Sequence, residues 1–154
     1  MTSTITKLNN CLATLPDWLY TTIARFAIGF TFLLGGLTKV DENYVILNKT
    51  YRLFNGYYFK NIPLPEGVIN VLTFIATYAE LILPLLLFIG LGSRFAALGL
   101  LIMTIVIQFV VFPDNLLKYP LHGLWAVALL AIIIKGPGPL SIDHWLKKRQ
   151  ENQL

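Results

Sequence analysis

Long runs of apolar residues dominate the chain, and their lengths predict helices that cross a lipid bilayer. The runs cover residues 18–38, 68–90, 95–112 and 120–135. A hydrocarbon core of roughly 30 Å needs about 20 helical residues, so the first two runs span it, the third just does, and the fourth is short. We predict an all-α integral membrane protein in which four helices, one for each run, pack as a bundle.

Two polar stretches complete this single predicted domain, residues 1–154: a long loop at 39–67 and a basic tail at 140–154. The loop is too long for a simple turn. Its centre holds five aromatic residues within nine positions, namely Tyr51, Phe54, Tyr57, Tyr58 and Phe59. Aromatic rings with one polar end favour the headgroup level, so we expect this loop at the outer membrane interface, with a lid over a binding site as the alternative. GPGP at 136–139 ends the fourth helix.

Four spans place both termini on one side of the membrane, together with a tight GLGSR turn at 90–94. That side carries six Lys and Arg residues against five on the other, which favours cytoplasmic termini. The apolar share of 56% excludes an ordinary soluble enzyme, and basic helix flanks explain the net charge of +4 without a nucleic-acid partner. A single cysteine, Cys11, excludes an internal disulfide or a CxxC redox pair.

Two charged residues lie deep inside predicted membrane helices, Arg25 in the first and Glu80 in the second. An ionised side chain near the bilayer centre costs at least ~3 kcal/mol, so each needs a partner, water or a change of protonation. Their heights, about 10 Å and 15 Å from the cytoplasmic side, differ by less than an arginine side chain can cover. We expect Arg25 and Glu80 to pair, either as catalytic, proton-handling groups or as a structural tie.

Polar and small residues also share one face of each of the first three helices. The faces comprise Thr22, Arg25, Gly29, Phe32 and Gly36 on the first, Thr73, Thr77, Glu80 and Pro84 on the second, and Arg94, Ala97, Leu101, Thr104 and Gln108 on the third. In lipid, such faces meet inside the bundle.

A second cluster is predicted nearer the outer face. Gln108 and His122 fall at similar heights, about 21 Å and 20 Å from the cytoplasmic ends of their helices, and together offer an amide and an imidazole to a ligand. An interfacial position is the alternative for His122. The two histidines lie on opposite sides, which argues against bis-histidine haem, and no metal, nucleotide or hydrolase motif is present. We expect no metal and no intrinsic cofactor.

Several segments resemble the DoxX family of small four-span bacterial membrane proteins. The resemblance covers roughly residues 18–145 and rests on ARFAIGFTFLLGGLTKV at 24–40, AELILPLLLFIGLGSRFAALGLLIM at 79–103 and GPGPLSID at 136–143. The second segment is the most specific, because an intramembrane Glu precedes a tight G-x-x-R-x-A-A-L turn. LFNGYYFKNIPLP and IQFVVFPDN look most like the branch found beside multinuclear iron enzymes that modify metal-binding peptides.

This resemblance implies a multi-pass protein of the bacterial plasma (inner) membrane, similar to the smaller subunits of thiosulfate:quinone oxidoreductase. It marks Arg25, Lys39, Glu80 and Arg94 as polar landmarks, so Lys39 and Arg94 join Gln108 and His122 as candidate ligand-binding residues. We expect an accessory or quinone-interacting subunit of a membrane oxidoreductase system, with a bound quinone and a membrane or soluble redox partner.

Two other functions stay open at this point. One is a membrane scaffold, chaperone or assembly factor in a metal-stress or modified-peptide pathway, with the aromatic loop as its interface. The other is a small transporter, which four short helices allow only if the chain forms a homo-oligomer.

Overall fold

A computed structural model describes residues 2–115 and 117–153 of the chain. Within these ranges the elements are all helical: α1 (Thr2–Ala13), α2 (Asp17–Leu37), α3 (Asn48–Leu53), the π-helix η1 (Phe54–Tyr58), α4 (Glu66–Ile89), α5 (Ser93–Val106), the π-helix η2 (Ile107–Val111), α6 (Tyr119–Lys135) and α7 (Ile142–Glu151). The described residues form no strand, only one isolated bridge between Val40 and Ile46. The all-α prediction is confirmed.

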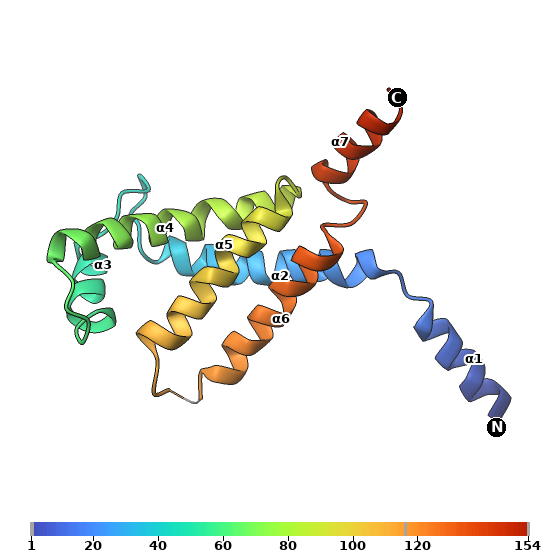
Figure 1. The fold of residues 1–154 in the computed structure, drawn as a ribbon, viewed down its shortest axis with the longest axis horizontal. Helices are drawn as coiled ribbons and strands as arrows, with labels where there is room; N and C mark the ends of the chain where they lie inside the picture. Colours follow the sequence, from blue (N-terminus) through green and yellow to red (C-terminus); the bar gives the residue numbers. More distant parts are fainter. Residues whose placement is uncertain (1, 116, 154) are drawn as a thin grey trace.

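Four of these helices form the bundle, and they correspond to the four apolar runs. Helix α2 packs against α4 and α6, and α5 packs against the same two helices, so the four close into a ring (Figure 1). Their shared core consists of apolar side chains, chiefly Ile28, Phe32, Leu87, Ala96, Ala97, Leu100, Leu129 and Ile132. Close packing of these faces holds the bundle together.

Three of the bundle helices are long and apolar enough to cross a membrane. They are α2, α4 and the continuous segment Ser93–Val111, which joins α5 to η2. Helix α6 is apolar but has 17 residues, roughly 26 Å at ~1.5 Å per residue. The fourth run is thus a shorter helix, as its length in the sequence indicated.

Glycine and an aspartate fix the turn that joins α4 to α5. Gly90 ends α4 in the left-handed conformation at φ 72°, and Leu91 N–H donates to Leu86 O at 3.0 Å. Helix α5 then begins with two backbone N–H groups, of Gly92 and Ser93, that donate to the Asp143 carboxylate at 2.7 and 2.9 Å. Asp143 therefore caps α5 from the distant GPGPLSID segment and ties the C-terminal part of the chain to this turn.

The polar ends of the chain contain two helices that the search for long apolar runs did not find. Helices α1 and α7 extend from the same end of the bundle as the α4–α5 turn (Figure 1). Both are short and amphipathic, with exposed apolar residues spaced three and four apart, such as Ile5, Leu8 and Leu12 in α1. Helices α1 and α7 therefore both lie at one end of the bundle.

The predicted aromatic loop is folded rather than extended. Thr50 donates its hydroxyl to Lys39 O at 2.9 Å, and helices α3 and η1 pack against α4. Phe54 and Phe59 are buried together with Ile69 of α4. Part of the aromatic surface therefore faces the protein. We call residues 48–60, which comprise α3, η1 and the two residues after it, the aromatic cap; they cover the N-terminal half of α4.

Candidate functional site

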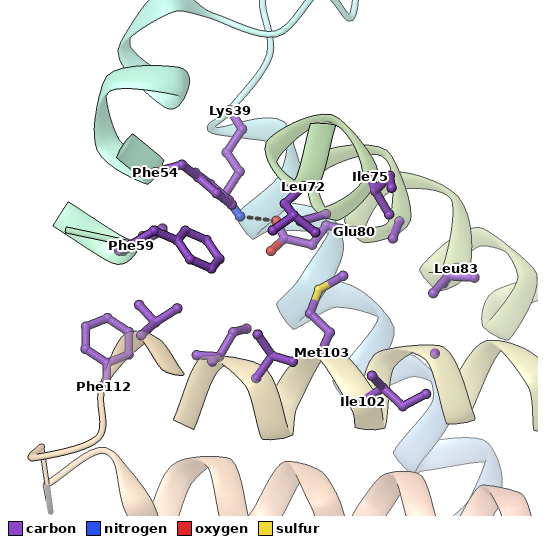
Figure 2. A pocket seen from close by; sticks show the side chains of 17 residues that line it. Lys39, Phe54, Phe59, Leu72, Ile75, Glu80, Leu83, Ile102, Met103 and Phe112 are labelled. Carbon is purple, nitrogen blue, oxygen red and sulfur yellow. Dashed lines mark hydrogen bonds and ion pairs between the residues drawn. The ribbon is translucent and has the colours of Figure 1, made fainter. Parts of the chain in front are cut away.

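The central polar contact of the bundle is an ion pair between Lys39 and Glu80. Lys39 follows the end of α2, and its Nζ donates to Glu80 Oε2 (Figure 2). The exposed fraction is 15% for the Lys39 side chain and 7% for that of Glu80, so the pair lies largely out of solvent. Two charges in such a place are tolerated only as partners.

Arg25 is not the partner of Glu80, and that sequence prediction is wrong. The predicted heights of Arg25 and Glu80 assumed that the cytoplasmic ends of α2 and α4 lie at the same level in the membrane. In the structure, α2 approaches α4 closely where Gly36 faces Glu80: a Cβ added at Gly36 would lie only 3.1 Å from Glu80 Cβ. Gly36 is eleven residues beyond Arg25, about 16 Å along the helix, which exceeds the reach of a guanidinium. Lys39, one turn beyond Gly36, is close enough.

Arg25 instead satisfies backbone carbonyls at the opposite end of the bundle. Its guanidinium donates to Leu87 O at 2.8 Å and Phe88 O at 3.0 Å in the last turn of α4, where carbonyls lack the regular i+4 donor of a helix interior. It also donates to Pro137 O at 2.6 Å and Leu140 O at 3.0 Å in the segment after α6. Arg25 is 1% exposed. Arg25 therefore ties α2, α4 and the GPGP segment together, without Glu80.

An apolar cavity of about 440 Å³ extends from the Lys39–Glu80 pair between α4, α5 and the aromatic cap. Figure 2 shows Phe59 and Phe112 at one side, Leu83 and Ile102 toward the other, and Met103 pointing from α5 towards Glu80. Apart from Lys39, Glu80 and the Tyr58 hydroxyl, the lining is aliphatic, aromatic or thioether. Such a space suits an apolar ligand with a few polar atoms at one place.

The cavity reaches the outer surface of the bundle between α4 and α5. Ile75 and Ile102 line it and are also 57% and 55% exposed. On a helix bundle in a membrane, this surface faces the acyl chains. A lipid-soluble molecule can therefore enter sideways from the bilayer, without passing through water.

Both π-helices contribute residues to this cavity. Phe54 and Tyr58 come from η1, and Ile107 and Val111 come from η2. A π-helix carries an extra residue per turn, which changes the direction of the side chains that follow, and such elements are frequent at functional sites. Sequence reasoning found neither the π-helices nor the cavity.

Tyr58 lines the cavity and carries a hydroxyl group. Burial raises the pKa of Tyr58 above its ordinary value of 10.0, and the nearby Glu80 carboxylate and Tyr57 raise it further. The phenol therefore stays protonated at neutral pH and can donate a hydrogen bond. The aromatic density around residue 58 was visible in the sequence, but the direction of each ring depends on η1.

Gln108 and His122 come together as their predicted heights required. His122 Nδ1 lies 2.7 Å from Gln108 Oε1, and Gln108 Nε2 donates to Phe112 O at 3.1 Å. Because Gln108 Nε2 donates to a carbonyl, Gln108 Oε1 is the atom that faces His122 and accepts from its Nδ1–H. In the neutral imidazole, Nε2 of His122 is then an acceptor. The pair joins η2 to α6 behind Phe112, whose ring centroid is 6.4 Å from that of His122.

Arg94 lies apart from both clusters. It is exposed at the start of α5, where its Nη2 makes a long 3.5 Å contact with Ile134 O. Of the predicted site residues, the structure thus brings Lys39 and Glu80 together at the cavity, places Gln108 and His122 beside it, and leaves Arg25 and Arg94 at the other end.

Comparison with known proteins agrees with the resemblance seen in the sequence. The DoxX family model matches residues 20–113, which include most of α2, the aromatic cap, α4, α5 and η2. The chain belongs to the DoxX family. A curated relative, an uncharacterized protein of Haemophilus influenzae, is 32% identical over 138 residues, covering 82% of each chain. No solved structure matches this DoxX protein. Family and apolar helices together make it a membrane protein.

Proposed function

We propose that this DoxX protein binds a quinone-like, lipid-soluble ligand in the cavity beside Glu80 and acts as an accessory subunit of a membrane oxidoreductase system. The observation that carries the proposal is the cavity itself: it is apolar, it opens towards lipid, and it has a buried ion pair in its wall. Its volume of about 440 Å³ is enough for a substituted ring with a short part of its tail.

The polar groups fit the two carbonyl oxygens of a quinone better than a purely apolar lipid. The Lys39 ammonium has three N–H donors, of which Glu80 occupies one, and Tyr58 adds a hydroxyl. Reduction of a quinone to a quinol takes up two electrons, which the redox partner supplies, and two protons, which come from water. Glu80, held at the cavity wall by Lys39, is placed to exchange a proton with the ligand, while Lys39 orients the ring.

Electrons come in this proposal from a membrane or soluble redox partner protein. The site lies in the inner membrane of a bacterium, with both termini in the cytoplasm. Gln108 and His122 play a supporting part, because they hold η2 and hence Phe112 against the cavity.

Copurified lipids test the proposal directly. We would purify the protein from native membranes in mild detergent and identify bound lipids and proteins by mass spectrometry. Ala79 lines the cavity, whereas Ala27 is exposed on the outside of α2. Near-stoichiometric quinone should remain with the native protein and with Ala27→Phe, and at least tenfold less with Ala79→Phe, because the new ring fills the cavity.

A different result would favour the scaffold function. If no quinone is bound and a protein partner copurifies equally with all three forms, the cavity is not a quinone site. The aromatic cap is a weaker basis for a protein interface than the sequence indicated, because Phe54 and Phe59 are buried within the chain itself.

A further inference from the structure

A groove at the other end of the bundle is lined by basic residues and lies among exposed apolar side chains. It has a volume of about 550 Å³ and lies between the α4–α5 turn, the GPGP segment and the first turns of α7. Its charged members are Arg94, Lys135, Asp143 and Lys147. We call this feature the basic groove; it shares no residue with the cavity beside Glu80.

Among the described residues, Asp143 is the one carboxylate that lines the basic groove, and the protein already provides its hydrogen bonds. Asp143 accepts hydrogen bonds from Gly92 N–H and Ser93 N–H at the positive end of the α5 dipole. Lys135 pairs with Asp17 at 2.7 Å, and Lys147 pairs with Glu151 at 3.8 Å. All four of these side chains are about half exposed or more, so water and salt weaken both pairs. The groove therefore presents an excess of positive charge.

Arg94 lies along the wall of the groove, and most of its N–H donors make no hydrogen bond to the described residues. A Cβ added at Gly136 would lie 3.4 Å from Arg94 Nη2, so the guanidinium rests against a residue that has no side chain. Within residues 2–115 and 117–153, its hydrogen bonding is limited to the long contact with Ile134 O. A guanidinium has five N–H donors and matches the oxygens of a phosphate.

Exposed apolar residues surround these cations. Phe95 is 82% exposed beside Arg94, and Trp145 and Leu146 of α7 are 58% and 41% exposed. The next residues in α7 are Lys147, Lys148 and Arg149, and the Arg149 guanidinium lies 5.6 Å from the centre of the Trp145 ring. An amphipathic helix of this composition lies along a membrane surface, with its apolar side chains below the headgroups and its cations among them.

We infer that the basic groove binds the phosphate headgroup of an anionic phospholipid, with α7 lying in the membrane interface beside it. The ends of membrane-spanning helices lie at the headgroup level, and the groove is formed where α4, α5 and α6 end. Phe95, Trp145 and Leu146 then contact acyl chains, while Arg94 and Lys147 contact phosphate oxygens. The inference does not depend on a quinone in the other cavity.

Lipid titration of the full chain in detergent, followed by native mass spectrometry, tests this inference. The probes are phosphatidylglycerol and phosphatidylcholine with identical acyl chains. We expect phosphatidylglycerol to bind more tightly, and Arg94→Gln/Lys147→Gln to weaken it at least about fivefold, since each cation near an anionic surface contributes roughly that factor. Phosphatidylcholine binding should change little.

A matched pair of lysines at the opposite end provides the control. Lys49→Gln/Lys60→Gln removes the same amount of charge from two exposed positions of the aromatic cap and should leave the preference for phosphatidylglycerol intact. Equal binding of the two lipids by the native protein, or an equal loss of preference in both double variants, would overturn the proposed site. Displacement of phosphatidylglycerol by excess inorganic phosphate would also overturn it, by indicating a site for the free ion.

A second variant tests the inference even if Arg94→Gln/Lys147→Gln fails to fold. Lys147→Gln/Lys148→Gln/Arg149→Gln changes only exposed positions of α7, which has no buried residue. Gel filtration and circular dichroism should show a folded protein with a reduced preference for phosphatidylglycerol. An undiminished preference in this folded variant would contradict the role of α7.

Discussion

Arg25, Lys39 and Glu80 are charged side chains that the bundle largely removes from solvent, and Arg25 is stabilised differently from the Lys39–Glu80 pair. Arg25 neutralises the negative end of α4 through backbone carbonyls, and Lys39 neutralises a carboxylate. The sequence indicated that Arg25 and Glu80 need partners, because the cost of a charge in lipid is high. It could not identify the partners, since the choice depends on how far α2 and α4 are shifted along each other.

Replacement of Lys39 by methionine should destabilise the protein strongly. Lys39→Met leaves Glu80 buried without its cation, and the loss of one member of a buried pair costs roughly 3–5 kcal/mol. The double variant Lys39→Met/Glu80→Gln has no buried charge at this place and should recover most of that stability. Thermal unfolding in detergent measures both; a single variant as stable as the native protein would contradict a buried ion pair.

Loss of the Tyr58 hydroxyl should weaken ligand binding without changing the fold. Tyr58→Phe removes one hydrogen-bond donor from the cavity, worth ~0.5–1.5 kcal/mol, or about two- to tenfold in affinity. Tyr57→Phe is the matched control, because Tyr57 is 54% exposed and does not line the cavity. The amount of quinone that copurifies reports the difference, and equal retention by both variants would exclude the hydroxyl from binding.

Elements were predictable where one strong signal determined them. The four apolar runs locate α2, α4, α5 with η2, and α6 to within two residues at every end, and Gly90 and GPGP end helices as expected. The short helices α1, α3 and α7 lack such a run. The π-helices depend on tertiary packing of Phe54 and Gln108, so local sequence patterns do not reveal them.

The α4–α5 turn should be sensitive to a single methyl group. Gly90 has φ 72°, and an added Cβ would collide with Ser141, whereas Gly92 has φ 57° and open space around it. Gly92→Ala should cost about 1 kcal/mol from backbone strain alone. Gly90→Ala should cost clearly more, because it also displaces the segment that carries Asp143. Thermal unfolding of the two variants compares them directly, and equal losses would show that this contact is unimportant.

At the scale of the whole molecule, the bundle separates two chemical environments. Helices α1 and α7 extend from one end of the bundle, and α3 lies at the other (Figure 1). The cavity and its ion pair lie beside the aromatic cap, whereas Arg25 and the basic groove lie at the end that carries α1 and α7. The sequence placed polar residues in the bundle interior but did not reveal the cavity. Cavity formation depends on how the residue 39–65 segment folds back over α4, which is a property of the complete fold.

Photolabelling with an azido-quinone tests the central claim, a quinone site beside Glu80, most directly. The reagent is applied to membranes that contain the native protein or Ala79→Phe, and labelled peptides are mapped by mass spectrometry. We predict label on cavity residues of η1, α4 and α5, such as Tyr58 and Met103, that excess unlabelled quinone prevents and Ala79→Phe abolishes. Label spread over the lipid-facing surfaces of all helices, unchanged by competitor or by Ala79→Phe, would contradict the account.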